Sequence, residues 1–263
     1  MNYFHLRFNG RANYPIIYMK RRVNIVVKKL SGAIALLTAE LLIVSISFFI
    51  SLSVLIIIIR QIFYRKEYNM DEKVFSYLSQ YVTETNTSLM QFFSFFGSHF
   101  LFVPGWLLLI IFYYFINKNV WMSVKTLIIA LSNVGLMFGL KLLFNRPRPV
   151  IQLLKDVRGL SFPSGHAFMS SVFYGFIIYL VYREVKNRWL KWIIIIMLVI
   201  IILIIGFSRV YLRVHYTSDV IAGYCFGIMS LLILLGLLGQ IEKYNAKTIP
   251  PHLNITKADK GLT

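Results

Sequence analysis

The segment WLKWIIIIMLVIIILIIGF, from Trp189 to Phe207, has 19 residues and a single charge, at Lys191. A helix crosses the hydrocarbon core of a bilayer with about 20 mostly apolar residues. Apolar runs near this length occur six times, at about residues 33–59, 100–117, 122–144, 165–182, 189–207 and 219–239. The sequence therefore predicts an all-α, polytopic membrane protein with six transmembrane helices.

The composition argues against an ordinary soluble protein. Of the 263 residues, 58% are apolar and 14% are charged, whereas soluble domains carry about 25% charged residues. The excess of 28 Lys and Arg over 10 Asp and Glu would suggest nucleic acid in a soluble protein. Here the basic residues lie between apolar runs, as in the loops of membrane proteins. We therefore expect a phospholipid bilayer as partner and no nucleic acid.

The distribution of basic residues predicts the orientation. The loops on the side of the N-terminus hold 17 Lys and Arg residues and those on the other side hold 11, which places both termini in the cytoplasm. We expect a basic cytoplasmic tail over 1–32, a six-helix membrane domain over 33–243 and a cytoplasmic tail over 244–263. The first run is too long for a signal-peptide core, so we expect it to stay in the protein. The Ile-rich and Lys-rich composition suggests a low-GC bacterial genome, and we expect the protein in the bacterial inner membrane.

Residues 60–99 form a long segment between the first two spans, and the predicted orientation puts it outside the cytoplasm. Its apolar residues Phe75, Leu78, Val82 and Leu89 recur at roughly helical spacing. The pattern predicts a short amphipathic segment, either a helix in the membrane interface or a lid packed over the outer loops.

Single residues of reactive type give weaker signals. Cys225 is the only cysteine, so we expect no disulfide and interpret it as a packing residue. The five histidines are scattered, without an HExxH or CxxC motif, and we expect no metal and no cofactor. Glu40 fits the cytoplasmic end of the first span. His99 fits an interfacial aromatic belt or a position near the outer loops' polar residues.

The loop between the third and fourth runs begins with KLLFNRPRP, which starts at Lys141, and closes with SFPSGH, which ends at His166. Its prolines should end the preceding helix. Lys141 either snorkels to the interface or faces the loop. Ser164 suits an N-cap, and the N–H groups of Gly165 and His166 would form an anion site at the helix N-terminus. The alternative is an ordinary cap with an interfacial histidine.

The loop before the sixth run, GFSRVYLRVHYTSDV, contains His215 and Asp219, four residues apart. If the helix begins by residue 215, the two share a face. The carboxylate would then fix the imidazole tautomer and leave the other nitrogen free to attack. Alternatively, Asp219 only caps the helix. Two histidines, a carboxylate, several cations and a helix N-terminus together suit phosphoryl transfer without a metal.

These residues resemble the type 2 phosphatidic acid phosphatase family, whose signatures are K-x6-R-P, P-S-G-H and S-R-x5-H-x3-D. All three signatures match in the family's order, and the resemblance extends over about residues 90–240. The matching residues are Lys141, Arg148 and Pro149; Pro163, Ser164, Gly165 and His166; and Ser208, Arg209, His215 and Asp219.

The resemblance implies a six-helix core and metal-independent dephosphorylation through a covalent phosphohistidine. His215 looks like the nucleophile, Asp219 the residue that orients it, and His166 the general acid and then the base for water. The residues implied to hold the phosphoryl oxygens are Lys141, Arg148, Ser164, Gly165 and Arg209. Arg146 and Arg213 lie outside the signatures and are candidates for contacts to a second phosphate or to anionic headgroups.

The expected substrate is a lipid phosphate whose headgroup lies at the extracytoplasmic face while its chain stays in the bilayer. Undecaprenyl diphosphate is favoured over phosphatidylglycerophosphate and phosphatidic acid. Two alternatives remain open, namely a phosphotransferase that passes the phosphoryl group to another lipid such as lipid A, and a non-catalytic lipid-headgroup binding or transport protein.

Overall fold

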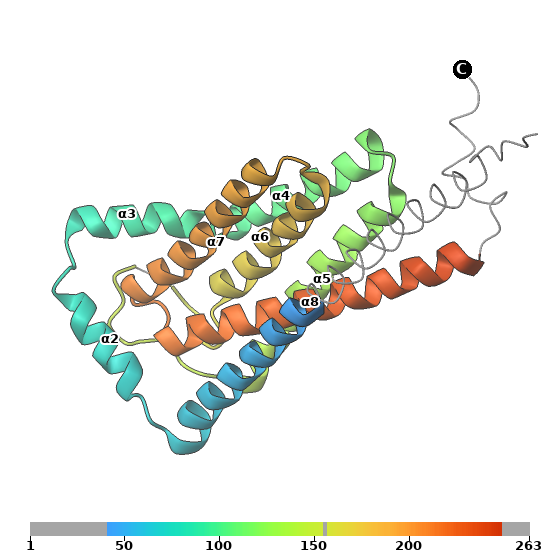
Figure 1. The fold of residues 1–263 in the computed structure, drawn as a ribbon. Helices are drawn as coiled ribbons and strands as arrows, with labels where there is room; N and C mark the ends of the chain where they lie inside the picture. The colour runs from blue at the N-terminus through green and yellow to red at the C-terminus, as the bar shows by residue number, and fades with distance from the viewer. Residues whose placement is uncertain (1–40, 155–156, 249–263) are drawn as a thin grey trace, which may run out of the picture. The chain divides into compact units, whose positions relative to one another are not determined.

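The computed structural model describes residues 41–154 and 157–248. The chain divides into two compact units, residues 1–47 and 48–263. Of the first unit, only residues 41–47 are described, and they are helical. The described part of the second unit consists of helices and loops without a strand, as Figure 1 shows. The all-α prediction is confirmed.

Six described stretches are long and apolar enough to cross a membrane, which confirms a multi-pass membrane protein. They are Leu41–Arg65, Glu84–Ile116, Val120–Phe144, Gly165–Glu184, Arg188–Tyr211 and Thr217–Tyr244. Residues 33–40 of the first predicted run, with Glu40, lie outside the described residues, as do the tail 1–32 and residues 249–263. The second span begins earlier than predicted. A helix over residues 84–95 comes before the apolar run, and only a short turn at residues 96–98 separates the two.

Side-chain caps and backbone geometry set the ends of these helices. Residues 41–59 are helical, and the later elements are η1 (Arg60–Arg65), α2 (Asn69–Ser79), α3 (Glu84–Phe95), α4 (His99–Ile111), η2 (Phe112–Ile116), α5 (Val120–Phe144), α6 (Gly165–Glu184), α7 (Arg188–Tyr211) and α8 (Thr217–Thr248). The side chains of Asn119 and Asn187 cap α5 and α7 by accepting backbone N–H groups. Asn145 ends α5 in the left-handed conformation, with φ of 43°.

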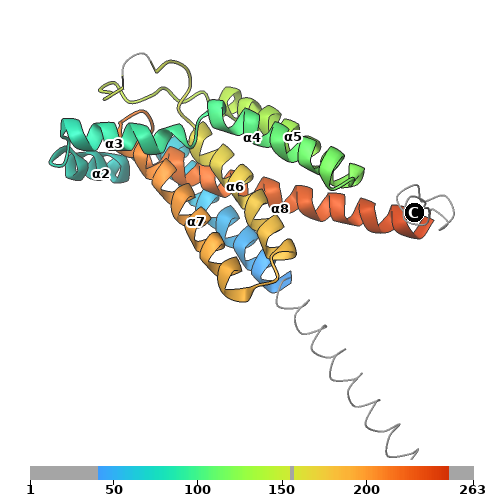
Figure 2. The same cartoon turned by 90° about the horizontal axis from the view of Figure 1, so that it is seen from above.

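The segment between the first two spans contains α2 and α3, which pack on the spans that follow. α2 contacts α7 and α8, and α3 contacts α7, an arrangement that can be followed in Figures 1 and 2. Leu78 of α2 is buried in an apolar cluster with Ala167, Val210 and Val220. These contacts favour a packed lid over a free interfacial helix, and the level of the segment relative to a bilayer stays a prediction.

Close packing between α6 and α8 positions the polar loops. α6 contacts α4, α5, α7 and α8. A Cβ added at Gly223 of α8 would lie 2.8 Å from the Ser164 carbonyl oxygen, and one at Gly227 would lie 2.7 Å from the Phe168 carbonyl oxygen. Glycines at this spacing let membrane helices approach closely. The start of α6 therefore rests on α8, where the Ser164 N–H donates to the Asp219 carbonyl at 3.0 Å.

Candidate active site

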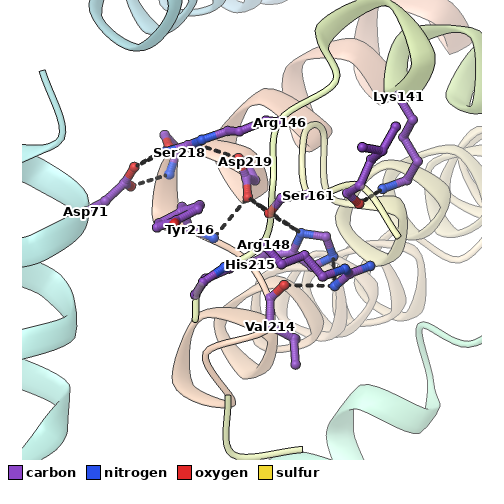
Figure 3. Close-up of polar contacts among 12 residues, drawn as sticks. Asp71, Lys141, Arg146, Arg148, Ser161, Val214, His215, Tyr216, Ser218 and Asp219 are labelled. Atoms are coloured by element: carbon purple, nitrogen blue, oxygen red, sulfur yellow. Dashed lines mark hydrogen bonds and ion pairs between the residues drawn. The ribbon is translucent and has the colours of Figure 1, made fainter. Parts of the chain in front are cut away.

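The polar clusters predicted from the sequence signatures meet in one place (Figure 3). Arg148 Nη1 lies 3.3 Å from His215 Nε2, and Ser161 Oγ lies 3.4 Å from His215 Nδ1. A Cβ added at Gly165, the first residue of α6, would lie 3.8 Å from Lys141 Cε at the end of α5. The end of α5, the loop over 145–164, the start of α6 and the loop between α7 and α8 thus form a single site.

His215 is buried in this site as a neutral imidazole. It is 1% exposed, and burial lowers its pKa to about 4, although Asp219 acts in the opposite direction. Arginine has only donors, so Nε2 must accept from Arg148 and the proton must sit on Nδ1. Nδ1 faces Ser161 Oγ and lies 3.6 Å from Asp219 Oδ2. The tautomer therefore leaves a lone pair on Nε2, as a nucleophile requires.

The backbone arrangement that brings His215 close to Asp219 is not the shared helical face considered in the sequence analysis. α8 begins at Thr217, so His215 lies before the helix and the two do not share a helical face. Instead, a tight turn after α7 brings His215 back. Its N–H donates to the Arg209 carbonyl at 3.3 Å, and Arg213 has a left-handed φ of 55°.

The Asp219 carboxylate is fully buried and fully engaged. Its Oδ2 accepts from the Ser161 hydroxyl and from the Tyr216 N–H at 3.0 Å, while its Oδ1 accepts from Arg146 Nη1 at 2.6 Å. The bond from Tyr216 satisfies an N–H group at the start of α8, in the manner of a capping box. Asp219 therefore both caps α8 and faces His215, so capping is not its only contact.

The cations of the signatures line the same site. Lys141 Nζ donates to the Leu160 carbonyl at 2.8 Å, and Arg148 Nη1 donates to the Val214 carbonyl at 2.8 Å. Burial lowers the pKa of the Arg148 guanidinium, and Asp219 acts in the opposite direction. Arginine remains charged through such a shift.

Two buried polar atoms in the site have no hydrogen-bond partner. Ser164 holds the N-cap position of α6, as predicted, but its side chain makes no capping bond and its Oγ is unpaired. Arg209 Nη1 donates to Ser94 Oγ of α3, while its Nε is buried and unpaired. Buried polar atoms are almost always paired, so these two are suited to an anionic ligand.

His166 lies in the first turn of α6, half-buried against the turn between α3 and α4. A Cβ added at Gly97 would lie 3.0 Å from its Cδ2, and Arg209, His215 and His99 are within electrostatic range. His99, whose ring lies 4.1 Å from that of Phe100, is thus near the polar site, and its place in an interfacial aromatic belt stays a prediction. The structure brings together all eight residues predicted for the site.

Arg146 has a different environment from the one expected. It is 6% exposed and pairs with Asp71 and Asp219, so it is not available to a second phosphate or to headgroups as expected from the sequence. Asp71, Ser94 and Ser161 were not predicted at all. No motif marks them, and nothing in the sequence separates Asp71 from the other acids of the 60–99 segment, such as its neighbour Glu72.

Among residues 41–154 and 157–248, no group of three His, Cys, Asp or Glu side chains could hold a metal ion. Cys225 is buried in an apolar cluster with Leu55, Phe162 and Ala222, which confirms it as a packing residue.

Comparison with known proteins links this site to phosphatases. Residues 122–242 match the sequence profile of the PAP2 superfamily. The chain is 27% identical over 137 residues to phosphatidylglycerophosphatase B of Bacillus subtilis, covering 51% of this chain and 66%, just under two thirds, of that protein. It is 30% identical over 163 residues to undecaprenyl-diphosphatase of Sulfolobus acidocaldarius, covering 60% of this chain and 75% of that protein.

A solved structure shares the fold. The crystal structure of a transmembrane PAP2-type phosphatidylglycerolphosphate phosphatase from Bacillus subtilis superposes with a TM-score of 0.64 at 22% identity. The superposition covers 74% of this chain and 98% of that one. This coverage shows that the described helices follow the architecture of a known membrane phosphatase.

Proposed function

Because this chain belongs to the PAP2 superfamily, we propose that it is an integral-membrane lipid phosphatase that works through a covalent phosphohistidine without a metal ion. The observation that carries the proposal is the state of His215. Its Nε2 lone pair points to the Arg148 guanidinium while its Nδ1 faces Ser161 and Asp219. This is the arrangement of a nucleophile with an orienting carboxylate.

The reaction has two steps. His215 Nε2 attacks phosphorus, the bond from phosphorus to the leaving oxygen breaks, and His166 donates a proton to that oxygen. His166 then removes a proton from water, whose oxygen attacks the phosphohistidine and returns His215 to its neutral form with release of phosphate. Asp219 stabilises the positive charge that the imidazole carries while it is phosphorylated.

The cations and the helix N-terminus would hold the phosphoryl group. Lys141, Arg148 and Arg209 offset the charge on its oxygens, and the N–H groups at the start of α6, with Ser164 Oγ, complete the cradle. The unpaired Ser164 Oγ and Arg209 Nε support this assignment because each can donate to a phosphoryl oxygen. A Cβ at Gly165, the first residue of α6, would crowd Met137 Sδ of α5 at 3.1 Å, so this glycine lets the end of α5 approach the start of α6.

The proposed substrate is a lipid phosphate or diphosphate at the extracytoplasmic face of a bacterial inner membrane, with both termini in the cytoplasm. The excess of Lys and Arg in the loops on the side of the termini supports this orientation. Undecaprenyl diphosphate is the favoured substrate because the relative with 30% identity and 75% coverage is named as an undecaprenyl-diphosphatase. A lipid tail would remain in the bilayer while the headgroup enters the site.

The test is phosphate release by the detergent-purified protein in the presence of a chelator. Undecaprenyl diphosphate, phosphatidylglycerophosphate, phosphatidic acid and a soluble phosphate ester are compared, with His215→Ala beside the wild type. We expect release from one lipid and none from the variant. Strong inhibition by the chelator, reversed by a divalent metal, would contradict the mechanism. Labelled phosphate passing to an added lipid acceptor instead of to water would indicate a phosphotransferase, and binding without either reaction would indicate a headgroup-binding protein.

A further inference from the structure

A buried charge network lies behind the Asp219 carboxylate, on its Oδ1 side (Figure 3). Arg146 bridges two acids, donating from Nη1 to Asp219 Oδ1 at 2.6 Å and from Nη2 to Asp71 Oδ2 at 3.0 Å. Asp71 belongs to α2, far from the signatures in the sequence, and is 2% exposed. The segment that packs over the site therefore contributes a charge to it.

Further contacts fix the geometry of this network. The Ser218 N–H donates to Asp71 Oδ1 at 2.9 Å, its hydroxyl donates to Asp71 Oδ2 at 2.6 Å, and the same hydroxyl accepts from Arg146 Nη1 at 2.8 Å. The Arg146 guanidinium also lies 4.0 Å from the centre of the Tyr216 ring, a favourable cation–π contact. Because both Nη atoms are bonded and the guanidinium packs against the Tyr216 ring, it has little freedom to turn.

The net charge of the network gives Asp71 a chemical role. Two carboxylates and one guanidinium leave one negative charge in a site from which water is largely excluded. If Asp71 were neutral, Arg146 and Asp219 would cancel and offer little to the positive charge on a phosphorylated His215. When Asp71 is charged, its negative charge offsets the positive charge of Arg146. The negative charge of Asp219 then remains available to stabilise the positive charge on His215.

We propose that Asp71 and Arg146 are positioning residues for catalysis. Arg146 fixes the Asp219 carboxylate so that Oδ2 faces His215, and Asp71 holds Arg146 and supplies the balancing negative charge. The proposal rests on His215 as the proposed nucleophile. This role is distinct from anchoring α2 to the other helices, because the apolar contacts of Leu78 already anchor α2.

The experiment compares Asp71→Asn, which keeps the shape and removes the charge, with Glu72→Gln. Glu72 is the next residue of α2 and is exposed, so this control loses the same charge outside the network. We expect Asp71→Asn to lower kcat by about 10-fold to 100-fold, the range found when the hydrogen-bond partner behind a metal ligand is removed. KM should change little, because Asp71 does not contact the cradle. Equal kcat values for the two variants would overturn the proposal.

A second comparison separates positioning from a merely structural role. In an Asp219→Asn background, Asp71→Asn should lower kcat by a much smaller factor than in the wild type, since it acts mainly through Asp219. A structural role would lower kcat by the same factor in both backgrounds, and that result would overturn the proposal. If Asp71→Asn does not remain monodisperse in detergent, Arg146→Lys takes its place, because a lysine keeps the charge but cannot bridge both acids.

Orthovanadate binding, followed by calorimetry, keeps this test distinct from the test of the proposed function. Vanadate accepts a nitrogen ligand in the geometry of phosphoryl transfer, so its affinity reports on His215 even without a known lipid substrate. If the wild type hydrolyses none of the lipids tested, the proposed function fails, and the affinity still decides this inference. We expect about 10-fold weaker binding in Asp71→Asn than in Glu72→Gln; equal affinities would overturn the inference.

Discussion

Replacement of Gly223 by alanine should impair catalysis through the packing of α6 on α8. The new Cβ would lie 2.8 Å from the Ser164 carbonyl oxygen and 3.0 Å from the Ala167 Cβ. Ordinary contact begins near 3.4 Å, so the start of α6 must move by about 0.6 Å. Overpacking of this kind costs about 1–3 kcal/mol, of which the better helix propensity of alanine offsets about 1 kcal/mol.

The same shift moves Ser164 and the helix N-terminus that we assign to phosphate binding. A misplacement of 1 Å can cost about 100-fold in rate, so 0.6 Å corresponds to roughly a 10-fold lower kcat/KM. The assay is kcat/KM for the lipid that the wild type hydrolyses, together with thermal unfolding in the same detergent. Gly227→Ala, with contacts at 2.7 Å to Phe168 and 2.8 Å to Ser171, should destabilise similarly but reduce activity less, since it lies one turn further from the site.

Gly236→Ala is the matched control on the same helix. A Cβ at Gly236 meets no atom within 4 Å, so this variant should be as active as the wild type and up to about 1 kcal/mol more stable. Unchanged kcat/KM in Gly223→Ala would refute the link between helix packing and the phosphate site. Equal impairment in Gly236→Ala would show that loss of glycine flexibility, and not contact with α6, is responsible.

Two further predictions concern the protonation of His215 and the support of Arg209. Because burial lowers the pKa of His215 to about 4, its free base persists through pH 5, and kcat/KM should lose this base only near pH 4. The acid limb of the pH profile, corrected for substrate ionisation measured by 31P NMR, checks this, and an enzyme pKa near the ordinary 6.5 on that limb would contradict it. Ser94→Ala removes the acceptor of Arg209 Nη1, and a hydrogen bond to a charged group contributes about 1.5 kcal/mol or more. KM should therefore rise about 10-fold, whereas Ser88→Ala at an exposed position of α3 should leave KM unchanged.

Hydropathy was sufficient to predict the six spans because a bilayer imposes a length and a composition on each helix separately. No long-range contact had to be known. The predicted boundaries are less accurate where helical structure extends outside the apolar run. The helix α3, for example, lies just before α4 and outside the predicted second run. Polar residues such as Glu84 and Asn86 at its start carry no hydropathy signal, although α3 packs on α7.

The site was predictable where its residues lie in motifs and unpredictable where they meet across the fold. His166, His215 and Asp219 stand at fixed spacings in short signatures. Asp71 and Arg146, by contrast, are 75 residues apart in the sequence, and nothing in either neighbourhood identifies the other. The position of Arg146 next to the matched Arg148 therefore suggests contacts to a second phosphate or to anionic headgroups, whereas burial between two carboxylates gives it another environment.

The way the helices alternate explains why distant motifs reach one site. In a chain of spans that cross the membrane in turn, the end of α5, the start of α6, the end of α7 and the start of α8 must emerge on the same side. The two C-terminal ends carry Lys141 and Arg209, and the two N-terminal ends carry the proposed phosphate cradle at Ser164 and the carboxylate of Asp219. Each charge is of the sign that its helix dipole favours. The cations that stabilise two helix ends thus face the anion site of a third, so the same placement that suits the fold concentrates positive charge where a phosphoryl group would bind.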